Sequence, residues 1–127
     1  MAGGNRNLVV SPDGSFVIAL AADSGYRRIS VANGSSQSVP GLTTADDVLR
    51  FSPDGKSVWI RQRNTIPVRV DRVDLSSGVR SALLPPFAFG RPGLAAIREV
   101  ALGDDPRNYV YIEREFAGYL FELTTKR

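Results

Sequence analysis

The side chains in this sequence that could carry out acid–base chemistry are two pairs of adjacent carboxylates, Asp46-Asp47 and Asp104-Asp105. A hydrolase that uses a general acid and a general base needs two such groups in one cleft. Adjacent residues of an extended chain point in different directions, so the members of each pair do not face a common substrate. We therefore expect both pairs to be solvated, and we assign no catalytic residue.

A second candidate for acidic chemistry is the motif Ser-Pro-Asp-Gly, which occurs at residues 11–14 and again at residues 52–55. Asp13 and Asp54 could hold a metal ion, because hard cations prefer carboxylate oxygens. The alternative is a tight turn, in which Pro presets φ, Asp accepts bonds from nearby amides and Gly tolerates positive φ. Both copies share the Asp, and neither has a partner carboxylate at a useful spacing. We interpret both as structural and predict no metal and no cofactor.

Four arginines are expected on two consecutive strands, where they could bind phosphate, an acidic peptide or RNA: Arg61, Arg63, Arg69 and Arg72. Three acidic residues are available for pairing across strands, namely Asp71, Asp74 and Glu113. The net charge of +3 is also weaker than a nucleic-acid footprint normally requires. We favour charge pairing, expect no nucleic-acid partner, and retain Arg61 and Arg63 as candidate contacts with a protein partner.

The segment 85–93 combines three Pro and two Gly with two aromatic residues, Phe87 and Phe89. Such a segment is expected to be a loop, because Pro and Gly interrupt regular structure. Loops are normally polar, and exposed aromatic residues often mark contacts. Either the loop covers one end of the fold or Phe87 and Phe89 bind a partner, and the sequence leaves both interpretations open.

The complete absence of His and Cys limits the chemistry further. It excludes His-based catalytic triads, thiolate nucleophiles, disulfides and zinc sites of the usual Cys/His kind. The 127 residues suffice for one domain with a hydrophobic core. Residues 1–7 are expected to be a flexible leader. No apolar run approaches the ~20 residues of a membrane span, and no targeting signal or particular compartment is indicated.

The elements that must position these side chains are short strands in repeated units. The two copies of Ser-Pro-Asp-Gly begin 41 residues apart, at Ser11 and Ser52, which is the period of a β-propeller blade. Each copy lies between two apolar runs, and Asn33-Gly34 is a strong hairpin signal within the first unit. The run 16–22 is almost continuously apolar, as in a strand covered on both faces. Each of these two units is therefore predicted to be an antiparallel sheet of four strands.

A third unit follows with less complete motifs. Residues 103–106, Gly-Asp-Asp-Pro, stand where the turn motif is expected, and strands are predicted on either side. Only three strands can be placed before the last residue. Trp59, Tyr109 and Tyr111 occupy matching strands and are expected to pack between units. We predict an all-β fold of antiparallel four-stranded blades in a partial β-propeller, with about three blades over 8–42, 47–84 and 96–123 and the last lacking a strand.

The repeated Ser-Pro-Asp-Gly motif resembles the WD40-like repeats of TolB-type β-propellers. The stretches 70–80, 109–111 and 118–123 are similar to the end of the propeller in bacterial serine/threonine kinases with a C-terminal TolB-like sensor region. The resemblance implies the closing portion of a larger propeller, spanning residues 8–127. No Gly-rich nucleotide loop, His-Arg-Asp or Asp-Phe-Gly occurs, so it does not imply kinase activity.

A propeller hosts many functions and implies none by itself. We expect a non-enzymatic interaction or sensor module that binds a protein or a small ligand through its blade loops. The alternative is a regulatory propeller fragment of a prolyl-oligopeptidase-like hydrolase. Because three units cannot close a ring, and unpaired strand edges are a liability, we also expect self-association through open blade edges.

Overall fold

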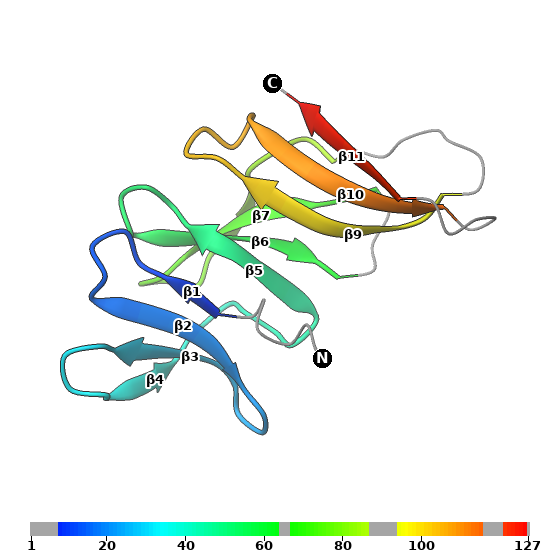
Figure 1. The fold of residues 1–127 in the computed structure, drawn as a ribbon. Helices are drawn as coiled ribbons and strands as arrows, with labels where there is room; N and C mark the ends of the chain where they lie inside the picture. The colour runs from blue at the N-terminus through cyan, green and yellow to red at the C-terminus, as the bar shows by residue number, and fades with distance from the viewer. Residues whose placement is uncertain (1–7, 64–66, 87–93, 116–120, 127) are drawn as a thin grey trace.

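The computed structural model describes residues 8–63, 67–86, 94–115 and 121–126, and these form eleven strands without a helix. The strands make three separate antiparallel sheets (Figure 1). Within the described part of the chain, no helix has the length and apolar character that crossing a membrane requires. The prediction of an all-β partial propeller is confirmed.

Each sheet is a meander in which consecutive strands are neighbours. The first sheet has the order β1 (Leu8–Val10), β2 (Phe16–Ala21), β3 (Gly25–Ser30) and β4 (Ser36–Ser38). The second has the order β5 (Asp46–Phe51), β6 (Ser57–Gln62), β7 (Val70–Asp74) and β8 (Arg80–Ala82). The third has three described strands, β9 (Leu94–Leu102), β10 (Tyr109–Glu115) and β11 (Phe121–Lys126). As predicted, the third sheet lacks a fourth strand among the described residues.

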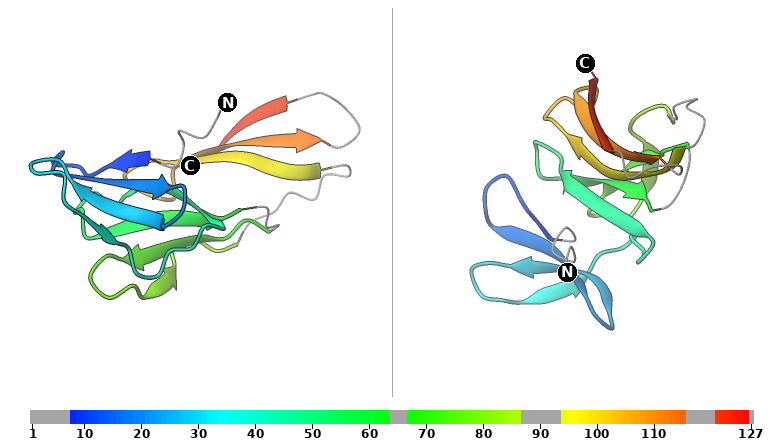
Figure 2. Two further views of the ribbon diagram at one scale, coloured as in Figure 1. Left: turned by 90° about the horizontal axis from the view of Figure 1, so that it is seen from below. Right: turned by 45° about the vertical axis from the view of Figure 1, so that its right-hand side comes forward.

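The second sheet lies between the other two, and apolar side chains fill both interfaces (Figure 2). We call the interface of the first and second sheets the first seam, and that of the second and third sheets the second seam. The alternation of β6 explains how one sheet serves both: Val58 and Ile60 belong to the core of the first seam, and Arg61 lies opposite Asp47 on the other face. The first strand of the second sheet, β5, also contacts β1 across the first seam and β9 across the second.

The Ser-Pro-Asp-Gly motifs form tight turns, as predicted. In the first turn the Ser11 amide donates to the Phe16 carbonyl (2.9 Å), and the Asp13 carboxylate accepts from the Ser15 amide (2.9 Å). Gly14 has a φ of 78°, a conformation that glycine adopts without strain. The second turn repeats these bonds one unit later, with Asp54 in the place of Asp13.

The third turn keeps this geometry with different residues. The Gly103 amide donates to the Asn108 carbonyl (2.8 Å) at the same spacing of five residues. The Asp105 carboxylate accepts from the Arg107 amide (3.0 Å), as Asp13 does from Ser15. Asp105 therefore occupies the place of the motif Asp, and Asp104 occupies the place of Pro53.

One expectation for β2 is wrong. Its apolar run was expected to be covered on both faces, yet Ile18 is the only fully buried residue of the strand. Ile18 faces the first seam, whereas Val17 and Ala19, on the opposite face, stay half-buried. The reason is that no described sheet packs against this second face. Residues 1–7, expected to form a leader, lie outside the described residues.

Candidate functional site

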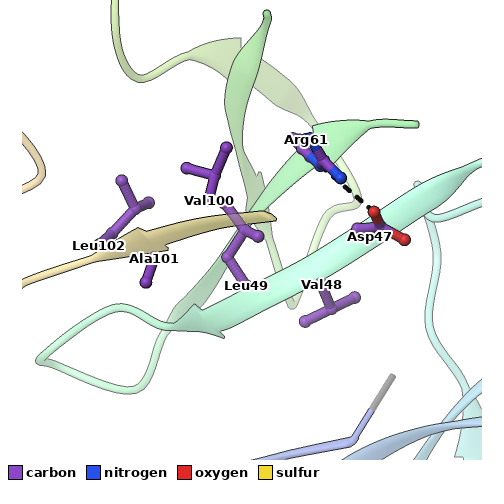
Figure 3. Close-up of a pocket in the computed structure, with 7 residues that line it drawn as sticks. All are labelled: Asp47, Val48, Leu49, Arg61, Val100, Ala101 and Leu102. Atoms are coloured by element: carbon purple, nitrogen blue, oxygen red, sulfur yellow. Dashed lines mark hydrogen bonds and ion pairs between the residues drawn. The ribbon is translucent and has the colours of Figure 1, made fainter. Parts of the chain in front are cut away.

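A pocket of about 190 Å³ lies in the second seam, between β5 and β9. Its walls come from three strands (Figure 3), and its lining residues are Asp47, Val48, Leu49, Arg61, Val100, Ala101 and Leu102. The pocket thus combines apolar walls from β5 and β9 with one ion pair. Sites for small ligands are commonly concave and mostly apolar, with a few polar groups that fix orientation.

The ion pair of the pocket is formed by Asp47 and Arg61, which face each other across β5 and β6. The Arg61 Nε donates to one carboxylate oxygen of Asp47 at 3.2 Å, and the side chains are 8% and 9% exposed. Arg63 donates to the other oxygen at 2.9 Å through its Nε. Two guanidinium groups therefore hold one buried carboxylate, which compensates for the loss of its hydration.

The neighbouring carboxylate, Asp46, faces the first seam. Arg80, from β8 at the far side of the same sheet, donates to both of its oxygens at 2.8 Å and 3.2 Å. Hydrogen bonds to Asp46 are the main cause of a raised pKa for the Arg80 guanidinium. Arg80 also donates to the Gly41 carbonyl at 3.1 Å, in the segment that joins the two sheets. Asp46 and Asp47 thus point to opposite seams, and each is neutralised by arginine.

The expectation that Asp46 and Asp47 are solvated is therefore wrong, since they are 1% and 6% exposed. The two side chains do diverge, as expected. They are nevertheless buried, because both faces of β5 are covered by a neighbouring sheet. The other pair follows the expectation more closely: Asp104 has a side chain that is 85% exposed and pairs with Arg50, and Asp105 pairs with Arg107.

The four arginines do not form one open surface, which agrees with the preference for charge pairing over a basic patch. Arg61 is buried against Asp47, whereas Arg69 and Arg72 are exposed. Arg63 is partly exposed beside Asp47, so a contact of Arg63 with a partner stays a prediction. Phe87 and Phe89 lie outside the described residues, and their role as partner contacts stays a prediction as well.

The Asp47–Arg61 pair was not predicted from the sequence. The register next to the turn, in which Phe51 lies opposite Val58, would place Asp47 opposite Gln62. A β-bulge between Val48 and Arg50 shifts this register by one residue and brings Asp47 opposite Arg61, where the opposite charges attract. The Tyr111 prediction is confirmed, because this ring is 4% exposed in the core of the second seam. Trp59 is buried as well, beneath the guanidinium of Arg50.

Comparison with known proteins supports the fold. No known family matches the sequence, and no curated protein matches it. The crystal structure of TolB from Acinetobacter baumannii is similar over 99% of this chain and 33% of that chain, with a TM-score of 0.58 and 16% identity. A TolB structure from Agrobacterium tumefaciens is similar over 92% of this chain and 44% of that chain, with a TM-score of 0.51 and 13% identity.

The chain therefore spans between a third and a half of the length of these structures. At such low identities the likeness shows the fold alone, which is that of a TolB-like β-propeller. The relationship to the propellers of serine/threonine kinases stays a prediction.

Proposed function

We propose that this chain is a non-enzymatic section of a β-propeller that binds a protein segment or a small ligand in the pocket between β5 and β9. The observation that carries the proposal is the composition of this pocket. Apolar residues of two sheets line it together with a carboxylate that accepts hydrogen bonds from two arginines. A partly apolar recess whose charged groups are already paired with one another suits an uncharged group, such as an apolar side chain of a partner peptide.

The same contacts argue for binding without catalysis. A general base needs a carboxylate that can take up a proton from a substrate. Both oxygens of Asp47 instead accept hydrogen bonds from guanidinium groups, and the sequence offers no His or Cys as an alternative. No described contact favours the hydrolase alternative over this proposal.

Obstructing the pocket tests the proposal. Ala101 lines it from an exposed position on β9, and its side chain lies on the opposite side of the strand from Val100 and Leu102, so the bulky ring of Ala101→Trp should obstruct access to the recess without entering the core. Peptides selected on the whole chain from a phage-displayed library should bind Ala101→Trp at least about tenfold more weakly than the wild type, as expected for blocking the centre of an interface. The matched control is Ala82→Trp, because Ala82 is exposed on β8 outside the pocket.

Two results would count against the proposal. One is a selection that yields no peptide with saturable binding. The other is a set of peptides that bind Ala101→Trp and Ala82→Trp equally well, since they would recognise another surface.

We also infer that the first sheet associates with a second copy of the chain. Its outward face carries Leu8 and Val10, which are 53% and 56% exposed, beside Val17 and Ala19 on β2. A sheet face of this apolar character is suited to packing against another sheet. The described outer edge of β11 is also unpaired in the third sheet, and open edges promote association between chains.

Solution mass decides this second inference. Light scattering on the whole chain should give a mass above that of one copy, and Val10→Asp should lower it toward one copy. Val79→Asp is the control, because Val79 is 63% exposed but lies in a hairpin and not on the sheet face. A well-folded wild type with the mass of a single chain would refute self-association and would leave ligand binding in the pocket unaffected.

A further inference from the structure

A second pocket, of about 230 Å³, lies in the first seam between the two Ser-Pro-Asp-Gly turns. Residues 11–13 form one side and residues 53–55 the other, and Ser15, Phe16 and Arg28 complete the lining. It is separate from the pocket between β5 and β9, with which it shares no residue. Two turns that were interpreted as purely structural therefore enclose a space between them.

The unusual group in this pocket is Arg28, on β3. Its guanidinium carbon lies 4.0 Å from the centre of the Phe16 ring, in a cation–π contact. Its Nε is buried and has no hydrogen-bond partner. No described carboxylate lies within ion-pair distance of Arg28, although Asp13 and Asp54 line the same pocket. A buried donor without an acceptor is costly, so this position is suited to an acceptor supplied from outside.

The second seam holds another arginine stacked on an aromatic ring, and there the guanidinium has acceptors. Arg50 lies over the ring of Trp59, with its guanidinium carbon 5.2 Å from the ring centre. Its Nε donates to the Phe51 carbonyl at 2.9 Å, and its two terminal nitrogens donate to the Leu102 carbonyl at 3.3 Å and to the carboxylate of Asp104 at 2.7 Å. Asp104 stands at the turn position that Pro53 occupies in the first seam. Where the second seam has a carboxylate, the first seam therefore has a pyrrolidine ring and an open pocket.

We propose that the pocket between the two turns binds the carboxylate of a ligand on Arg28. The ligand carboxylate takes the part that Asp104 plays for Arg50, in a charge-assisted hydrogen bond to the guanidinium. A carboxylate fits better than a phosphate, because Asp13 and Asp54 repel a dianion more strongly than a monoanion. The volume is below that of drug-sized sites, so the bound part is about the size of one amino-acid residue.

Nuclear magnetic resonance of the whole chain, labelled with ¹⁵N, tests the proposal directly. N-acetylglycine is the principal probe, and its amide, N-acetylglycinamide, is the control that lacks the carboxylate. N-acetylglycine should shift the Arg28 Nε–H and the Gly55 amide saturably, with a millimolar dissociation constant typical of a single small contact. N-acetylglycinamide should shift neither signal. Acetate is a third probe. Tighter binding of N-acetylglycine than of acetate would indicate a peptide C-terminus as the ligand, and equal binding would indicate a free small acid.

Arg28→Gln should abolish the saturable shift of the Gly55 amide, and it should fold because Arg28 makes no hydrogen bond in the described structure. The matched control is Arg27→Gln on the same strand, since Arg27 donates to Ser36 and does not line the pocket. The proposal is overturned if neither carboxylate gives a saturable shift, if Arg28→Gln titrates like the wild type, or if inorganic phosphate binds more tightly than N-acetylglycine. None of these outcomes depends on the pocket between β5 and β9.

Discussion

The first and second seams each hold an arginine stacked on an aromatic ring beside the turn of the following sheet. In the second seam Arg50 reaches across to Asp104 and the Leu102 carbonyl, so the cation ties two sheets together. In the first seam Arg28 lies over Phe16 and has no acceptor. The comparison indicates that Arg50 finds its acceptors within the chain, whereas Arg28 needs an acceptor supplied by a ligand.

The first seam is held by other contacts instead. Its buried core includes Ile18, Val58 and Ile60, none of which has exposed surface, and the Tyr26 hydroxyl donates to the Asp46 carbonyl at 2.7 Å. Burial is the main cause of a raised pKa for Tyr26. Gly41 and Gly78 approach so closely that a Cβ on Gly41 would collide with the Gly78 carbonyl. A seam with this much packing can accommodate an unpaired arginine, because its stability does not depend on that residue.

The largest expected effect tests whether packing in the first seam contributes more to the free energy of unfolding than packing in the second seam. Ile18→Ala removes a side chain with no exposed surface from the first seam, and Leu84→Ala removes one that is 7% exposed from the second. Both should lower the free energy of unfolding by about 2–5 kcal/mol, with Ile18→Ala at the upper end. Urea denaturation measures both. A greater loss of stability from Leu84→Ala than from Ile18→Ala would contradict the conclusion that the first seam contributes more to stability.

The next effect concerns the ion pair of Asp46 and Arg80, which joins β5 to β8 within the second sheet. Arg80→Leu should destabilise the chain by about 2 kcal/mol, because it leaves the Asp46 carboxylate buried without its cation. Arg107→Leu is the control, since Arg107 pairs with Asp105 at an exposed turn and should change stability by less than about 0.5 kcal/mol. Equal effects of the two substitutions would show that the Asp46–Arg80 pair stabilises the fold no more than an exposed ion pair does.

The two stacked arginines can be compared directly. Arg50→Gln should cost about 1 kcal/mol, because it removes hydrogen bonds between the second and third sheets. Arg28→Gln should cost less than Arg50→Gln, since it removes the cation–π contact with Phe16 but no hydrogen bond, and it relieves a buried donor. Thermal unfolding of both variants provides the measurement. A destabilisation by Arg28→Gln as large as that by Arg50→Gln would mean that Arg28 already has an acceptor in the folded chain.

The sequence predicted the fold because its signals are local. The turns at 11–14 and 52–55 form from their own Ser, Asp and Gly residues, and the alternation around Trp59 places Ile60 and Arg61 on opposite faces. The two pockets were not predicted, because each depends on which sheet covers which face. That arrangement results from packing between units 41 residues apart, and no single motif encodes it.

The smallest expected effect is a difference between two turns in how their stability depends on pH and salt. The turns are those that contain Asp13 and Asp105. Hydrogen bonds from Ser15 and Ser11 lower the pKa of Asp13 from 3.8 to about 2, whereas Arg107 is the main cause of a lowered pKa for Asp105. A carboxyl group whose pKa is lower in the folded state stabilises the fold above its unfolded pKa, and loses that contribution as the pH falls through its folded pKa. For Asp13 the loss therefore lies between about pH 4 and pH 2.

Asp13→Asn should flatten the dependence of the urea midpoint on pH in this range, at low and at high salt alike, because neutral hydroxyl and amide donors are not screened. Asp105→Asn should flatten it less at high salt than at low salt, since the exposed ion pair with Arg107 loses its attraction when salt is added and only the bond from the Arg107 amide remains. If salt affected the two variants equally, hydrogen bonds from neutral donors would not be the main stabilising contacts of the turn at residues 11–14. The Asp13 carboxylate would then depend on nearby cations, of which Arg28 is the one that lines the same pocket.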